Sequence, residues 1–163
     1  MHDQSATLHD ITRLLAVIDT RLPAPVVATL RPPASAESIA QIEHLLGASL
    51  PSELHQLLRW HDGQEWNAAL RESDNRRLIS VGEIVDALKF FLDPEEEFLE
   101  PWGRYWLPFL TNDSGDYVVV DASPEGKGEV IAYWHDWEDR SVEYSSMVEW
   151  AAGLIDELGE GEV

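Results

Sequence analysis

The sequence contains no cysteine, which excludes disulfides, thiolate metal sites and cysteine nucleophiles. It also contains no apolar run of the roughly 18 residues that a membrane-spanning helix needs. The first residues, Met1 to Ser5, lack the basic start and apolar core of a signal peptide. These absences predict a protein of a reducing compartment, with the cytoplasm as its default location, and no membrane partner.

Positive charge is scarce in this chain. Eleven Lys and Arg residues stand against 31 Asp and Glu residues, which gives a formal net charge of −20. Such a chain repels nucleic acid and anionic membranes, because both bind proteins through their phosphate groups. The charge therefore predicts a basic protein partner and no nucleic-acid partner. The alternative interpretation is that the acidity only keeps the protein soluble.

Motifs that carry metal or phosphate chemistry are also missing. The sequence has no Gly-x-Ser-x-Gly elbow, no phosphate-binding Gly-rich loop and no His-Glu-x-x-His pattern. Residues Asn112–Asp116 have the carboxylates and the glycine that calcium loops use, but not the alternating ligands and closing glutamate of an EF-hand. We predict a hairpin turn there, and we expect neither a metal nor another cofactor.

Two histidines lie beside an aspartate, in the pairs His61–Asp62 and His135–Asp136. Neighbouring side chains point to opposite faces of a strand and diverge by about 100° in a helix, so neither pair forms a catalytic dyad by itself. We therefore expect a protein that is not an enzyme. A hydrolase that uses His61 or His135 is the alternative hypothesis, and replacing both histidines with Ala tests it.

The chain of 163 residues is 44% hydrophobic, which suits one domain with a single core. Helical spacing of apolar residues, caps and proline positions predict five helices: residues 5 to 22, between Ser35 and Gly47, from Pro51 to Gly63, from Ser80 to Asp93, and from Ser146 to Leu158. Residues rich in β-branched and aromatic side chains predict strands at 78–79, 105–110, 117–121 and 130–135.

Runs of helices followed by runs of strands predict an α+β fold, with an antiparallel or mixed sheet and helices packed on one side of it. We divide the chain into an N-terminal helix with a Pro-rich connector (residues 1–34) packed on the domain, the domain itself (35–158) and an acidic tail (159–163).

The order of six segments resembles the SUKH (Smi/Knr-like) superfamily. The segments are Glu37–Gly47, Leu50–Leu54, Trp60–Gly63, Trp106–Phe109, Gly115–Asp121 and Gly128–Asp136. The first three are similar to the helix hairpin of that superfamily, with Leu-Pro opening the second helix and a polar residue and glycine ending it. The last three are similar to its strands. The chain differs in having Asp62 where the family often has Asn, and in its own N-terminal helix.

The resemblance implies a protein-binding module of the SUKH fold without a common catalytic set. In bacteria it implies an immunity protein against a polymorphic toxin, often a nuclease or a deaminase. The alternative is a regulatory or scaffold module with an endogenous partner, like other members of the superfamily. Fold alone does not decide between them.

Exposed aromatic residues ringed by carboxylates suit a protein interface, since Trp gives a large contact area and charge steers the partner. Trp66, Trp102 and Trp137 lie in polar or acidic segments and are expected at an interface, whereas Trp134 fits either role. Three tryptophans on apolar patterns are expected in the core: Trp60, Trp106 and Trp150.

The combined prediction is a cytoplasmic immunity protein that binds and occludes a cognate, basic toxin, as a monomer or weak homodimer. The candidate partner-binding residues are acidic or aromatic: Asp62, Glu65, Trp66, Asp113, Asp116, Asp136, Trp137 and Glu138. The identity of the toxin and the binding face are left open by the sequence.

Overall fold

In a computed structural model, helices pack against one antiparallel sheet. The structure describes residues 4–66, 68–70, 76–93, 102–124, 128–134 and 141–158, with side chains from Ile11 onward. The helices of these ranges are α1 (Gln4–Arg21), α2 (Ala24–Val27), α3 (Ala36–Leu46), α4 (Ser52–Trp60), α5 (Val81–Phe91) and α6 (Met147–Leu158). The strands are β1 (Arg77–Leu78), β2 (Trp106–Thr111), β3 (Tyr117–Asp121), β4 (Val130–Tyr133) and β5 (Val142–Tyr144).

The caps that the sequence predicts are present at α3 and α5. Ser35 Oγ accepts a hydrogen bond from Ser38 N at 3.1 Å, and Gly47 ends α3 with a left-handed φ of 77°. Ser80 caps α5 in a complete capping box. Pro51 differs from the prediction, because it is the N-cap of α4 rather than its first residue. The missing N–H of proline suits either position.

Two short elements are absent from the sequence prediction. Helix α2 is a single turn within the Pro-rich connector, with a proline in its first two positions. The N–H that proline lacks would have no partner within the helix at these positions. Strand β5 is an edge strand whose Val142 is 52% exposed. A strand of three residues on the edge of a sheet carries too little apolar alternation to be recognised.

The five strands lie in the order β1-β2-β3-β4-β5, and every neighbouring pair is antiparallel. This confirms the α+β class and the meander, and it selects an antiparallel sheet over a mixed one. A register shift between Pro108 and Leu110 interrupts the β2–β3 ladder, which is a bulge that bends the strand.

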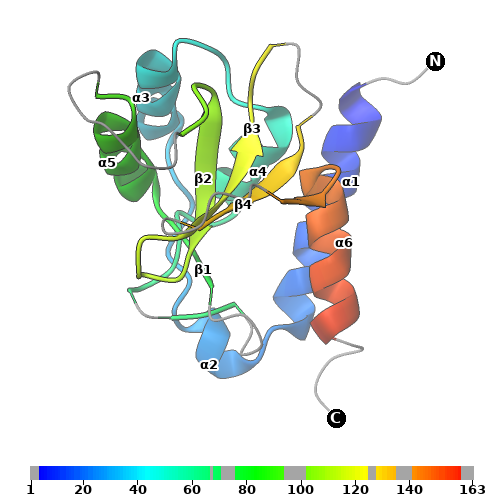
Figure 1. The fold of residues 1–163 in the computed structure, drawn as a ribbon. Coiled ribbons are helices and arrows are strands. Elements are labelled where there is room, and N and C mark those ends of the chain that lie inside the picture. Colours follow the sequence, from blue (N-terminus) through cyan, green and yellow to red (C-terminus); the bar gives the residue numbers. More distant parts are fainter. Residues whose placement is uncertain are drawn as a thin grey trace.

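The main hydrophobic core lies between the sheet and the helices. Figure 1 shows α1 and α6 side by side at the right of the view and α3 and α5 together at the left, and all four contribute to this one core. Five helices and the sheet contribute fully buried side chains, among them Ile18, Ile42, Leu54, Ile84, Met147, Leu107 and Val130. Glu43 of α3 has a structural role in the α3–α4 hairpin, since its Oε2 accepts a hydrogen bond from Leu50 N at 2.8 Å.

A second, aromatic cluster covers the opposite face of the sheet. Val119 belongs to this cluster while its neighbours in β3 belong to the main core, as the two-residue period of a strand requires. Trp102 is 9% exposed and stacks on Phe91, with ring centroids 4.0 Å apart and an interplanar angle of 10°. The prediction that Trp102 lies at an exposed interface is therefore wrong, because the end of α5 covers its ring.

Candidate functional site

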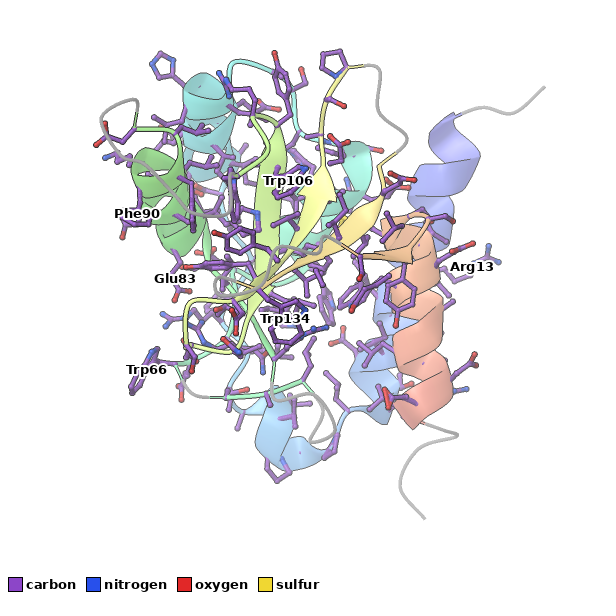
Figure 2. The ribbon with its side chains drawn as sticks, viewed as in Figure 1. Arg13, Trp66, Glu83, Phe90, Trp106 and Trp134 are labelled. Atoms are coloured by element: carbon purple, nitrogen blue, oxygen red, sulfur yellow. The ribbon has the colours of Figure 1, made fainter. Side chains whose placement is uncertain are left out.

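A cavity of about 680 Å³ opens between α5 and the face of the sheet that carries the aromatic cluster. We call it the α5 cavity. Its aromatic lining residues are Trp66, Phe90, Phe91, Tyr117 and Tyr133, and its ionisable ones besides tyrosine are Arg77, Glu83, Asp86 and Asp113. Figure 2 shows Phe90, Glu83 and Trp66 along the same side of the molecule, with Phe90 and Glu83 at α5. The volume lies in the range of binding pockets, about 300–1,000 Å³.

One row of residues across four strands forms the floor of the cavity. Arg77 pairs with Thr111, Thr111 with Tyr117, and Tyr117 with Tyr133. Residues opposite each other in a ladder share a face of the sheet, so all four side chains lie on the cavity side.

Arg77 is the centre of the polar part of the site, and its side chain is only 2% exposed. Its Nε donates to Asp113 Oδ2 at 2.9 Å, and its Nη2 donates to Glu83 Oε2 at 2.6 Å and to Asp113 Oδ1 at 2.7 Å. Its Nη1 donates to Glu83 Oε1 at 3.1 Å and to the backbone oxygen of Gln64 at 3.2 Å. Every nitrogen of the guanidinium therefore has an acceptor within the protein.

Local structure holds both carboxylates in place. The capping box at the start of α5 fixes Glu83, because its Oε1 accepts a hydrogen bond from Ser80 N at 2.9 Å. Asp113 lies in the β2–β3 loop with a left-handed φ of 64°. Asn112 Oδ1 accepts from Ser114 N at 2.9 Å and stabilises that loop, as short polar side chains do in turns.

The charged groups of the site shift one another's pKa values. Burial raises the pKa of Glu83, but hydrogen bonds from Arg77 and Ser80 outweigh burial and leave the pKa below the usual range of a glutamate. Burial lowers the pKa of Arg77, while Asp113 and Glu83 raise it to above its ordinary value. Burial, followed by the charge of Glu83, raises the pKa of Tyr117. At neutral pH Glu83 is therefore ionised and Tyr117 is neutral.

The mouth of the cavity carries exposed aromatic rings and an exposed carboxylate. The side chain of Trp66 is 69% exposed and that of Phe90 is 52% exposed. Asp86 is exposed on the same face of α5, one turn from Glu83 and one turn from Phe90. One arginine against three carboxylates gives the lining a formal charge of −2. An apolar mouth with excess negative charge suits the binding of a protein side chain.

Two of the predicted binding residues, Trp66 and Asp113, line this cavity together. Trp66 is exposed at the mouth, whereas Asp113 is 9% exposed and paired with Arg77. Glu65 is exposed next to Trp66. The part of these residues in partner binding stays a prediction.

The other predicted residues lie elsewhere. Asp62 is half-buried, and its Oδ1 accepts a hydrogen bond from Val81 N at 2.7 Å, which ties the end of α4 to the start of α5. Asp116 accepts a hydrogen bond from Asn112 Nδ2 at 2.9 Å within the β2–β3 loop. Three further predicted residues fall outside the described ranges: Asp136, Trp137 and Glu138.

Sequence reasoning missed the other lining residues of the cavity, among them Arg77, Glu83, Asp86 and Phe90. Phe90 carried a usable signal, because a phenylalanine outside the apolar stripe of a helix is a candidate surface anchor. Arg77 carried none. Its partners lie 6 and 36 residues away, and only the folded chain brings them together.

His61 is occupied by structural contacts. Its Nδ1 lies 2.6 Å from the backbone oxygen of Arg31, and its Nε2 lies 3.6 Å from Asp19 Oδ1. Asp19 Oδ2 also accepts a hydrogen bond from Trp60 Nε1 at 2.8 Å. Asp62 bonds to Val81 instead of to His61. His135 lies outside the described residues.

Trp134, which fits either role by sequence, is 38% exposed and is not among the residues that line the α5 cavity. The guanidinium carbon of Arg76 lies 5.5 Å from the centroid of its ring, within the range of a cation–π contact. Within the described ranges, no group of three or more His, Asp or Glu side chains is placed to hold a metal ion. No described helix has the length and apolarity to span a bilayer.

Comparison with protein families gives a match over most of the chain. The family model described as the SMI1 / KNR4 family (SUKH-1) matches residues 33–153, which confirms the resemblance noted in the sequence. The match includes α3 to α5, the whole described sheet and the lining of the α5 cavity. No curated protein matches the chain.

Proposed function

The chain belongs to the SMI1 / KNR4 family (SUKH-1), and from that premise we propose that it is a non-catalytic cytoplasmic immunity protein that binds and occludes a cognate, basic toxin. The observation that carries the proposal is the α5 cavity with the exposed indole of Trp66 at its mouth. Trp residues at interfaces contribute a large part of the binding energy of protein complexes.

Charge supports a basic partner. The whole chain has a formal charge of −20, and exposed Glu65 and Asp86 lie next to the aromatic mouth. An acidic surface accelerates encounter with a basic protein, toward about 10⁸ M⁻¹s⁻¹ at low salt. If the toxin acts on nucleic acid, its active-site cleft is basic, and an acidic protein takes the place of the phosphates.

Binding without chemistry is sufficient for this function. A complex with a Kd of about 1 nM, equivalent to about −12 kcal/mol, leaves little free toxin at cellular concentrations. The one described histidine of the candidate dyads supports this view, since His61 is engaged with Arg31 and Asp19. The alternative is a regulatory module that binds an endogenous protein through the same cavity.

Co-expression tests the proposal. The C-terminal domain encoded by the large reading frame next to this gene is expressed in a host cell with and without the protein. We expect the domain alone to stop growth and the protein to restore it. Growth that is unaffected by the domain, or unrestored by the protein, would favour the regulatory alternative.

Trp66→Ala is the informative variant, and Trp134→Ala is its matched control, because both indoles are exposed but only Trp66 lines the α5 cavity. We expect Trp66→Ala to lose rescue and Trp134→Ala to keep it. Circular dichroism of both purified variants checks that each one is folded.

A further inference from the structure

We propose, resting on the function proposed above, that the α5 cavity is a receptor for an arginine side chain of the partner protein. The partner residue enters between Trp66 and Phe90 and pairs with Asp86. This names the chemistry that the partner must present, which neither the family nor the fold specifies.

The charge balance of the cavity disfavours an anionic occupant. Arg77 is its only cation among the lining residues, and all three guanidinium nitrogens already donate to Asp113, Glu83 or backbone oxygens. The arginine therefore has no donor left for a phosphate or carboxylate from outside. The excess formal charge of −2 instead favours a positive group.

Asp86 is the carboxylate that is open to such a group. Glu83 uses both of its oxygens for Arg77 and Ser80, whereas Asp86 is exposed and forms no ion pair with any described residue. Asp86 follows Glu83 by three residues and precedes Phe90 by four, so the three side chains share one face of α5. The free carboxylate thus lies beside an aromatic ring.

The aromatic lining favours arginine over lysine. The guanidinium group is planar, stacks on aromatic rings and binds a carboxylate with two parallel hydrogen bonds. The ammonium group of lysine is compact and lacks the flat surface and the paired donors for these contacts. The chain already makes such a contact within itself, where Arg76 lies over Trp134. A volume of about 680 Å³ leaves space for the side chain together with a neighbouring partner residue.

Small-molecule probes test the proposal on the whole protein. N-acetyl-arginine methylamide is titrated against ¹⁵N-labelled protein, and the citrulline counterpart serves as an uncharged probe of the same shape. We expect saturable NMR shifts at the Trp66 indole and at the amides of Asp86, Phe90 and Gly115. Loss of the charge-assisted hydrogen bonds should weaken citrulline binding by about tenfold or more. Equal binding of the two probes, or shifts spread evenly over the acidic surface, would overturn the proposal.

Asp86→Asn and Asp156→Asn form a matched pair of variants. Both aspartates are exposed on helices, and Asp156 lies on α6 away from the cavity lining. We expect Asp86→Asn to weaken binding of the arginine probe by about tenfold. Asp156→Asn should leave the affinity for the probe unchanged. Equal weakening by both variants would show general attraction by the charge of the protein, against the proposal.

The growth assay separates this proposal from the proposed function. If the arginine probe does not bind but Trp66→Ala still abolishes rescue, the immunity function stands and the arginine receptor is overturned. If the wild-type protein gives no rescue but the probe binds as expected at Asp86 and Trp66, the receptor stands and the immunity function is overturned.

Discussion

The α1–α6 side of the molecule and the corner formed by β1 and α5 are built from different interactions. Helices α1 and α6 pack through apolar side chains such as Ile18 and Leu154, each at most 1% exposed. The β1–α5 corner is equally closed around Arg77, at 2% exposed, but its buried groups are charged. Burial alone therefore does not distinguish the two regions.

The difference shows why the cavity lies at the corner. Apolar packing is nondirectional, so side chains on the α1–α6 side can fill the available space. An ion cluster must satisfy the directions of its hydrogen bonds, and the carboxylates that hold Arg77 also line the opening beside α5. The molecule combines a rigid polar anchor with an open aromatic mouth, as a preorganised binding site requires.

The largest expected effect is at the centre of the corner. Arg77→Met leaves Glu83 and Asp113 without their common cation, which should lower the free energy of unfolding by about 3–5 kcal/mol. Urea denaturation measures the change. The variant R77M/E83Q/D113N should regain part of the loss, because the unpaired charges are removed. A loss below about 1 kcal/mol in Arg77→Met would show that the ion cluster does not hold the corner.

On the apolar side, Leu154→Ala should lower the free energy of unfolding by about 3 kcal/mol, because it leaves a cavity in the core. Asp156→Ala, on the exposed face of the same helix, is the control and should change stability by less than about 0.5 kcal/mol. The loss in Leu154→Ala should be the same at all pH values at which the protein is folded. A marked pH dependence would contradict the view that this side is held by apolar packing alone.

The two regions also differ in how far the sequence predicts them. The helical period of apolar residues locates α1 and α6 almost to their observed ends, since it records local amphipathicity. The Arg77 cluster joins residues that are 36 positions apart through a loop, and no periodic pattern marks such a contact. Of the candidate site, Trp66 and Asp113 were predicted and line one cavity, while Arg77, Asp86 and Phe90 required the fold.

The Trp60–Gly63 motif shows the same limit. Its glycine is readable as a helix end, but its tertiary role is not. Gly63 has a φ of 79°, and a Cβ there would lie 2.5 Å from Ser80 N. The motif thus allows the end of α4 to approach the start of α5 closely, while Asp62 bonds to Val81 N. The sequence pattern predicts a turn, and the structure shows the packing behind it.

A glycine pair measures this close approach. Gly128 has a similar φ of 74°, but a Cβ added there would have no described atom within 4 Å. Both Gly63→Ala and Gly128→Ala should carry the backbone strain of a left-handed alanine, about 1 kcal/mol. In Gly63→Ala, steric overlap should lower the free energy of unfolding by about 1–3 kcal/mol more than in Gly128→Ala. Thermal unfolding measures the stability of both variants. Equal losses of stability in the two would refute close packing at the corner.

The smallest expected effect concerns pH. The pKa of Glu83 is lowered in the folded protein, so its stabilising contribution is fully present above the unfolded pKa and is lost as the pH falls through the folded value. Glu83→Gln should therefore destabilise the protein at neutral pH, and the difference from wild type should shrink at acidic pH. The side chain is 37% exposed, which makes this change smaller than that of Arg77→Met.

Urea denaturation of wild type and Glu83→Gln between neutral pH and about pH 3, below the ordinary pKa of a glutamate, measures this difference. Glu37→Gln, at an exposed position in the first turn of α3, is the control for a general loss of negative charge. A difference that grows as the pH falls would contradict the assigned direction of the Glu83 shift.

The central claim is that the partner binds at the α5 cavity, and its most direct test is the Kd of the toxin domain identified by co-expression. Isothermal titration calorimetry compares wild type, Trp66→Ala and Trp134→Ala. We predict that Trp66→Ala weakens binding by about 30-fold or more, equivalent to about 2 kcal/mol, and that Trp134→Ala changes the Kd by less than about threefold. An unchanged Kd in Trp66→Ala, or an equal loss in both variants, would contradict the claim.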